Sequence, residues 1–178
     1  MNPGLFALDQ FPTGLIAVTG GEGSGKTRLL RRLSGDLPSL PGEIQHPDAQ
    51  WLDLDLSQQG DQSPQTVWTE LRNTSPGWNT ELQHELVDAM NLNQHLEKKL
   101  FMLSKGSRRK VALVALLSCG ATVTCLDQPY AALDLSSIKV LREFLGDMSD
   151  QPTRIWVVAD YEADPQLRWR KVISLDIA

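Results

Sequence analysis

The residues best suited to chemistry form one short run near the N-terminus, Gly20-Gly21-Glu22-Gly23-Ser24-Gly25-Lys26-Thr27. The run matches the pattern GxxxxGK[ST], in which glycines let the backbone wrap its N–H groups around phosphate oxygens. In such a loop the lysine reaches the β- and γ-phosphates and the hydroxyl of the last residue binds Mg²⁺. We therefore expect Lys26 and Thr27 to take these roles in binding a nucleoside triphosphate with Mg²⁺.

The segments on either side of this run fit a phosphate-binding loop. Residues 15–19 (LIAVT) are typical of a buried strand, and residues 28–33 (RLLRRL) of an amphipathic helix. A helix that begins directly after the loop adds the partial positive charge of its N-terminus to the phosphate site. The alternative interpretation is a glycine-rich turn that binds nothing.

Size and charge describe a protein of ordinary composition. The chain has 178 residues, of which 41% are hydrophobic and 22% charged, as expected for one soluble domain with a full hydrophobic core. The net charge of −5 argues against a nucleic-acid partner. The only basic patch is small and lies at Lys105, Arg108, Arg109 and Lys110.

Cysteine usage and hydropathy predict a cytoplasmic protein. Cys119 and Cys125 lie within an apolar run, which is typical of free buried thiols in a reducing compartment. The N-terminus lacks the features of a signal peptide. The longest apolar run, residues 111–126, contains polar residues and is shorter than the roughly 20 residues that span a bilayer. We therefore expect no transmembrane segment.

Strand and helix patterns alternate along the rest of the chain. Hydrophobic periodicity predicts strands at residues 15–19, 51–56, 121–126, 154–159 and 171–175. It predicts helices at residues 63–72, 80–90, 93–100, 108–117 and 136–148, with Ser63 and Thr80 as candidate N-caps. The alternation predicts an α/β fold with a mostly parallel sheet and a nucleotide at the carboxyl ends of its strands. Residues 64–100 form a helical insert between strands.

A second group of motifs surrounds the strand at residues 121–126. That strand continues into Asp127-Gln128-Pro129, with Leu103-Ser104-Lys105-Gly106-Ser107 upstream and Ala132-Leu133-Asp134 downstream. In order and spacing these resemble the Walker B, signature and D-loop motifs of ATP-binding-cassette (ABC) ATPases. Within that family the chain looks most like the haem-exporter ATP-binding subunit of cytochrome c maturation. The resemblance covers nearly the whole chain.

The resemblance implies a P-loop NTPase fold with an ABC-type helical subdomain. Residues 1–178 would form a single ABC ATPase domain, with residues 1–62 and 101–178 as the RecA-like core and residues 63–100 as the helical subdomain. The short N-terminal segment implies a reduced antiparallel β-subdomain.

The resemblance also implies how ATP and Mg²⁺ are bound. In the family two such domains pair head to tail, so Ser104 and Gly106 of one chain would contact, in trans, the ATP held by the loop of the other. Asp127 would hold Mg²⁺ through its water shell. The Q-loop glutamine that touches Mg²⁺ would be Gln58, with Gln59 as the alternative.

Three departures from the family pattern affect catalysis and nucleotide binding. Gln128 replaces the catalytic glutamate, and an amide orients water but does not act as a base at neutral pH. Asp160 replaces the switch histidine, and an ionised carboxylate there would repel the γ-phosphate. Losing both favours a naturally degenerate site over an introduced glutamate-to-glutamine change. No tyrosine precedes the loop to stack on adenine; Phe6 or Phe11 could replace it, although both are more typical of core residues.

We therefore expect an ATP-binding subunit of an ABC transporter with weak or no hydrolysis. Its expected partners are a membrane-spanning subunit and a second ABC ATPase chain, identical or different, which would place it on the inner face of the membrane. Residues 63–72 and 79–100 would dock the membrane subunit, with Trp68 and Leu71 as contacts. The alternatives are an active transport ATPase in which a residue such as Asp160 substitutes as base, and a non-transport regulatory or scaffold protein.

Overall fold

The computed structural model describes residues 11–39 and 46–176, and the chain divides into two compact units. The sheet unit comprises Met1–Trp51, Ala121–Gln128 and Arg142–Ala178. The helical unit comprises Leu52–Gly120 and Pro129–Leu141. The division of residues 1–62, 63–100 and 101–178 expected from the sequence stays a prediction.

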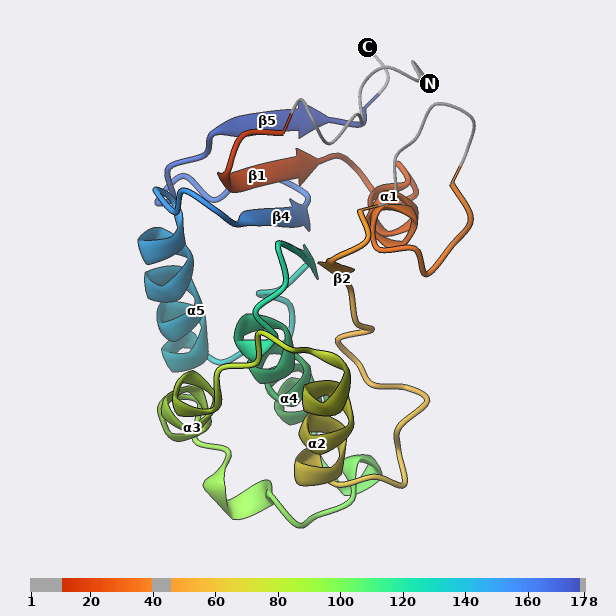
Figure 1. Ribbon diagram of the computed structural model, residues 1–178, viewed down its shortest axis with the longest axis vertical. Coiled ribbons are helices and arrows are strands. Elements are labelled where there is room, and N and C mark those ends of the chain that lie inside the picture. The colour runs from red at the N-terminus through yellow and green to blue at the C-terminus, as the bar shows by residue number, and fades with distance from the viewer. Residues whose placement is uncertain (1–10, 40–45, 177–178) are drawn as a thin grey trace. The chain divides into compact units, whose positions relative to one another are not determined.

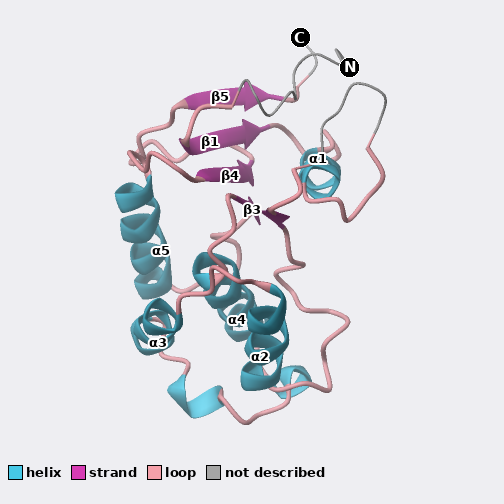
Figure 2. Ribbon diagram, viewed as in Figure 1, coloured by secondary structure: helices cyan, strands magenta, loops and turns pink. Residues whose placement is uncertain are grey.

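The sheet unit contains a five-stranded sheet in the order β2-β3-β4-β1-β5 (Figures 1 and 2). Its strands are β1 (Gly14–Thr19), β2 (Ala49–Gln50), β3 (Val123–Asp127), β4 (Ile155–Asp160) and β5 (Lys171–Ser174). All pairings among the described strands are parallel, which confirms the predicted α/β class. Most of the segment expected to hold a reduced antiparallel subdomain, residues 1–10, lies outside the described residues.

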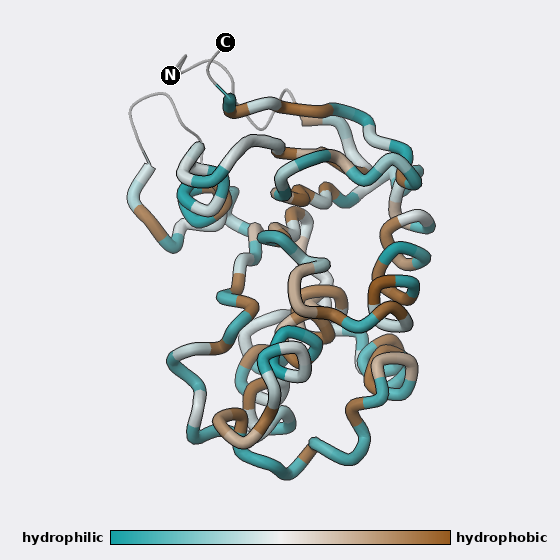
Figure 3. The backbone as a smooth tube through the Cα atoms, turned by 180° about the vertical axis from the view of Figure 1, so that it is seen from behind, coloured by the Kyte–Doolittle hydropathy of each residue, from teal (hydrophilic) through white to brown (hydrophobic). Residues whose placement is uncertain are grey.

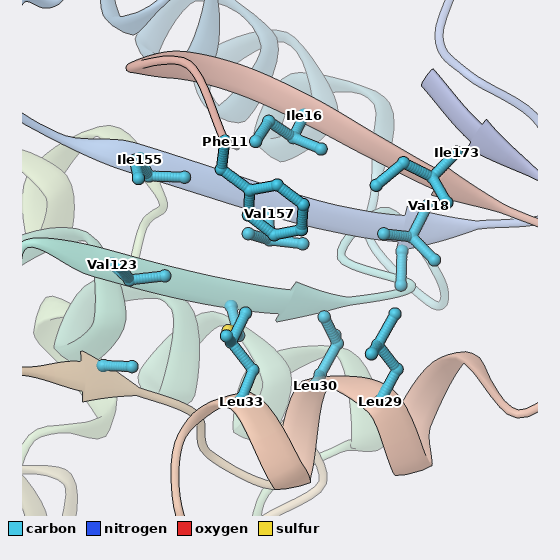
Figure 4. Close-up of a cluster of buried hydrophobic side chains, with 13 residues drawn as sticks. Phe11, Ile16, Val18, Leu29, Leu30, Leu33, Val123, Ile155, Val157 and Ile173 are labelled. Carbon is cyan, nitrogen blue, oxygen red and sulfur yellow. The ribbon is translucent and has the colours of Figure 1, made fainter. Parts of the chain in front are cut away.

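Helix α1 (Lys26–Leu33) covers one face of this sheet. Its three leucines point at the strands, where they meet β-branched residues of β1, β3 and β4 (Figure 4). The leucines recur at helical spacing, Leu29, Leu30 and Leu33, and all three are buried. Phe11 belongs to the same cluster and is 8% exposed, so it is a core residue. Phe6, the other aromatic considered for adenine stacking, lies outside the described residues.

The opposite face of the sheet is equally apolar. Leu15, Leu126 and Trp156 are fully buried there. The C-terminal part of α5 (Leu135–Met148) supplies Phe144, whose ring meets that of Trp156 edge-on with centroids 5.2 Å apart. Burial on both faces is the reason why these strands read as continuous apolar runs in the sequence.

The helical unit is built on α2 (Pro64–Thr74), α3 (Thr80–Ala89) and α4 (Lys105–Ser118), with 3₁₀ turns η3 (Asn93–His95) and η4 (Leu100–Met102). Figure 3 shows apolar residues recurring along its helices. Residues 111–118 of α4 are all buried. Trp68 is 3% exposed and its Nε1 donates to the carbonyl oxygen of Val111 at 2.9 Å. The expectation that Trp68 docks a membrane subunit is therefore wrong.

The predicted strand at residues 51–56 is wrong. Among the described residues, the only ladder pairing near it is β2, Ala49–Gln50, and residues 54–55 form a turn instead. The Asp53 carboxylate accepts from the backbone N–H of Asp55 and of Ser57, which bends the chain. Leu54 and Leu56 are both buried, so the alternation of apolar and acidic residues reflects a packed loop and not a strand.

Three helix predictions are also corrected by the structure. Asn79, and not Thr80, caps α3, because its Oδ1 accepts from the Leu82 N–H at 3.0 Å. Helix α4 begins at Lys105, so it includes the predicted loop before residue 108. The predicted helix at residues 93–100 is two separate 3₁₀ turns. Ser63 does cap α2, as predicted. Within the described ranges, no helix is both long and apolar enough to cross a membrane.

Candidate functional site

The predicted phosphate loop joins β1 to α1. The loop passes through positive-φ backbone at Gly20, Gly23 and Gly25, and Gly25 is the N-cap of α1 with φ of 99°. No side chain caps this helix within the described part of the chain. The N–H groups of the first turn of a helix have no intrahelical partner, so an uncapped N-terminus presents donors and partial positive charge to an anion.

Lys26 lies at the start of α1 and is 5% exposed. Its Nζ donates to the carbonyl oxygens of Gly20, at 2.5 Å, and Gly21, at 2.7 Å. The same Nζ lies 4.9 Å from the ring centroid of Tyr161. An ammonium group has three N–H donors. The two carbonyls therefore fix the ammonium group and leave one donor for a ligand.

A cavity of about 310 Å³ opens beside this loop. It is lined by Glu22, Gly23, Gly25, Lys26, Thr27, Arg28, Arg31 and Gln128. Within the loop, Ser24 Oγ is buried without a hydrogen-bond partner in the described part of the chain. A buried hydroxyl normally has a partner, and a phosphate oxygen would supply one. The charge, the free donors and the volume of the site fit a polyphosphate.

The residues predicted around the γ-phosphate lie at the carboxyl ends of the neighbouring strands. Asp127 ends β3 opposite Ala159, and Asp160 ends β4 opposite Thr19, directly before the loop. Gln128 lines the cavity, with φ of 46° and its N–H donating to the Ala159 carbonyl at 2.7 Å. Asp160 Oδ1 accepts from the N–H of Tyr161 at 2.8 Å. The structure thus brings Gln128 to the same cavity as Lys26 and Thr27.

The signature residues lie at the N-terminus of α4, in the helical unit. Ser104 is the N-cap, and its Oγ accepts from the Ser107 N–H at 3.1 Å. A Cβ on Gly106 would stand 2.5 Å from the Ala132 carbonyl oxygen, closer than atoms approach, so this position needs glycine. The D-loop residue Asp134 pairs with Lys110 of α4 at 2.5 Å.

An acidic residue of the loop before α2 fixes the same end of α4. Asp55 pairs with Lys105 at 3.2 Å and with Arg109 at 2.9 Å. Burial raises the pKa of the Asp55 carboxyl, but the hydrogen bonds from Arg109 and Lys105 outweigh it and hold that pKa below its usual value. Lys105 of the signature is therefore engaged within its own unit.

Gln58, the predicted Mg²⁺-sensing glutamine, is exposed in the loop before α2, and Gln59 is half-buried. Gln58, Ser104 and Gly106 all belong to the helical unit, so their approach to a nucleotide stays a prediction.

Two residues outside the predicted site contact the loop. Tyr161 faces the Lys26 ammonium, and Asp176 Oδ1 accepts from the Gly21 N–H at 2.8 Å. The sequence places Tyr161 two residues after one predicted strand and Asp176 directly after another, but only the strand order β4-β1-β5 shows that these strands flank β1.

The profile of the ABC transporter family matches residues 7–131. The chain belongs to the ABC transporter family. A cytochrome c biogenesis ATP-binding export protein, CcmA, of Nitrosospira multiformis is 33% identical over 143 residues, which are 72% of this chain and 69% of the relative. The CcmA protein of Wolbachia pipientis is 30% identical over 168 residues, 85% of this chain and 78% of the relative. These relatives confirm the resemblance inferred from the motifs.

Solved structures of this family share the fold. An ABC transporter ATP-binding protein from Pyrococcus furiosus superposes with a TM-score of 0.72 at 24% identity, covering 91% of this chain and 84% of that chain. An ATP-binding subunit of another ABC transporter gives a TM-score of 0.67 at 16% identity, covering 82% and 68%. They confirm the P-loop architecture of this ABC family member.

Proposed function

We propose that this chain is the ATP-binding subunit of an ABC transporter of the CcmA type, binding Mg-ATP through the loop at residues 20–27. The observation that carries the proposal is the uncapped N-terminus of α1 beside a buried lysine with one donor left for a ligand. Thr27 and Gln128 line the same cavity as that lysine. Phosphate oxygens are the anions that this arrangement favours.

The metal would be held by oxygen donors at the edge of the sheet. Thr27, in the first turn of α1, and Asp127, at the end of β3, are the candidate residues for Mg²⁺, and Gln58 is the further candidate that the family resemblance implies. When bound, Mg²⁺ would neutralise charge on the β- and γ-phosphates. Hydroxyl, carboxylate and amide oxygens are ligands that this ion accepts.

Hydrolysis at this site is proposed to be weak. Gln128 orients a water molecule but removes no proton from it, and Asp160 adds negative charge at the end of β4 where a donor is needed. We expect Gln128→Glu to raise ATP turnover about ten-fold or more, since a general base contributes roughly 10²-fold and Asp160 remains unfavourable. Gln128→Asn is the control, which also lacks a base and should show no rise in turnover. High wild-type turnover that depends on Lys26 would instead favour the active ATPase with a substitute base.

Dimerisation and membrane association belong to the same proposal. The chain would pair head to tail with itself or with a second ABC ATPase, and Ser104 and Gly106 would complete the partner's site. Docking on a membrane-spanning subunit would hold it at the cytoplasmic face of the membrane. A regulatory or scaffold role is the alternative, and it predicts that the chain co-purifies with no membrane-spanning protein.

Mg-ATP binding tests the proposal. Isothermal titration calorimetry on the wild type should show one site per chain, and Lys26→Ala should weaken that binding strongly. Lys139→Ala removes an exposed lysine of α5 instead and should bind as the wild type does. Absence of binding at millimolar Mg-ATP would reject nucleotide binding as the function.

A further inference from the structure

A carboxylate outside all of the family motifs contacts the phosphate loop. Asp176 follows β5, which runs parallel to β1 (Figure 1), and the Leu175 N–H donates to the Thr19 carbonyl at 2.8 Å. This pairing sets Asp176 beside the first residues of the loop. Its Oδ1 accepts from the Gly21 N–H at 2.8 Å.

The approach of this carboxylate requires a loop without side chains at its start. A Cβ on Gly20 would lie 3.2 Å from Asp176 Oδ1 and 2.7 Å from Ser24 Oγ, and Gly20 has φ of 153°. The absence of a side chain at Gly20 thus leaves room for both Asp176 Oδ1 and Ser24 Oγ.

The peptide group that Asp176 contacts is also the one that Lys26 contacts. The Gly20–Gly21 peptide consists of the Gly20 carbonyl and the Gly21 N–H. Its N–H donates to Asp176, and its carbonyl accepts from Lys26 Nζ at 2.5 Å. A carboxylate, a peptide and an ammonium group therefore form one hydrogen-bonded chain. Hydrogen bonds in such a chain polarise and strengthen one another.

We propose that Asp176 is a positioning residue for the phosphate site, acting on Lys26 through the Gly20–Gly21 peptide. The proposal rests on the proposed ATP binding. It means that Asp176, in the C-terminal segment, contributes to nucleotide affinity. The carboxylate fixes the peptide plane and strengthens the carbonyl as an acceptor. That carbonyl and the Gly21 carbonyl hold two donors of the ammonium group, so the third faces the ligand.

The same carboxylate is a negative charge near an anion site, and this repulsion opposes the positioning effect. Asp176 is exposed to solvent, which screens the repulsion, whereas the hydrogen-bonded chain ends on a lysine that is 5% exposed. Positioning should therefore dominate. The substitution Asp176→Asn keeps an Oδ1 acceptor and removes the charge, so it separates the two effects.

Three variants test the proposal. Asp176→Ala should weaken Mg-ATP affinity about three- to ten-fold, the loss expected for one net hydrogen bond. Asp176→Asn should remain within about two-fold of the wild type. Asp150→Ala removes another exposed carboxylate of the sheet unit, one paired with Arg168 and Arg170, and should leave affinity unchanged. Unchanged or tighter binding by Asp176→Ala would overturn the proposal, as would an Asn variant as weak as the Ala variant.

A measurement on the nucleotide-free protein separates this inference from the proposed function. The exchange of the Gly21 amide hydrogen, followed by NMR, should be faster in Asp176→Ala than in the wild type, and Asp176→Asn should restore protection. Equal exchange rates of the Gly21 amide in the wild type and both variants would contradict the hydrogen bond from Gly21 to Asp176. If Asp176 protected the Gly21 amide in a wild type that binds no Mg-ATP, the hydrogen bonds proposed here would stand and the proposed ATP binding would be rejected.

Discussion

The two glycine-bearing helix N-termini of this protein differ in how their first-turn donors are used. At α1 the N-cap is Gly25, and no side chain caps the helix within the described residues. At α4 the N-cap is Ser104, whose hydroxyl already accepts from the Ser107 N–H. The serine cap satisfies one of the first-turn N–H donors of α4, whereas no described side chain caps those of α1. We therefore expect the phosphate loop to be the primary anion site and the signature to be a second contact.

The lysines beside these N-termini differ in the same way. Lys26 binds two carbonyl oxygens, and the described residues contain no ion pair to it. Lys110 of α4 is paired with Asp134 at 2.5 Å and donates to the Met90 carbonyl at 3.1 Å. The charge of Lys26 is therefore available to a ligand, and that of Lys110 is neutralised within the fold. Substitution of Lys26 should therefore weaken ligand binding, whereas substitution of Lys110 should lower the stability of the fold.

Removal of Trp68 should have the largest effect, and the effect should be on stability. Trp68→Ala should lower the free energy of unfolding by about 3–5 kcal/mol, because a buried ring and its hydrogen bond to Val111 are lost. Trp68→Phe keeps the ring packing and should recover more than half of that loss. Urea denaturation provides both values. A loss of unfolding free energy under about 1 kcal/mol for the Ala variant would contradict the view that buried side chains stabilise the helical unit.

The lysine pair should separate binding from stability. Lys26→Ala should weaken Mg-ATP binding roughly 100-fold, because it removes the buried ammonium group that would contact the phosphates. Lys110→Ala should leave affinity unchanged and lower stability by about 1 kcal/mol, since solvent screens the half-exposed Asp134. Calorimetry and urea denaturation of both variants measure the four values. Equal effects of the two variants on affinity would remove the distinction between the sites.

The cap of α4 should contribute to stability and not to ATP binding by the isolated chain. Ser104→Ala should lower the free energy of unfolding by about 1 kcal/mol and the melting temperature by about 2–4 °C. Ser104→Asp retains a cap and should melt near the wild type. Differential scanning calorimetry measures these changes. If Ser104→Ala weakened ATP binding at protein concentrations where the chain is monomeric, α4 would be part of the primary site.

The Asp134–Lys110 pair should give the smallest effect, and it should depend on pH. The hydrogen bond from Lys110, followed by that from Ser136, lowers the pKa of Asp134 well below 3.8. A carboxyl with a depressed folded pKa stabilises above its unfolded pKa and loses that contribution as pH falls through its folded pKa. Asp134→Asn should therefore melt about 1–3 °C below the wild type at pH 5–7, with the gap closing below about pH 4. A gap that widens in acid would contradict this.

The sequence predicted the phosphate loop, which is formed by backbone groups, better than it predicted the side-chain contacts around that loop. Within the run at residues 20–27 and the strand ending at Asp127, the residues that matter follow one another at fixed spacing, so the sequence alone indicates their chemistry. The strand predicted at residues 51–56 failed because an Asx turn and two buried leucines give the same alternation. Tyr161 and Asp176 could not be found, since their contacts depend on which strands flank β1.

The most direct test of the account is a titration of the ¹⁵N-labelled chain with Mg-ATP, followed by NMR at concentrations where it is monomeric. We expect amide shifts concentrated at residues 23–28, at the open N-terminus of α1, with residues 105–107 of α4 unchanged. Shifts of equal size at both N-termini, or none at residues 23–28, would contradict it.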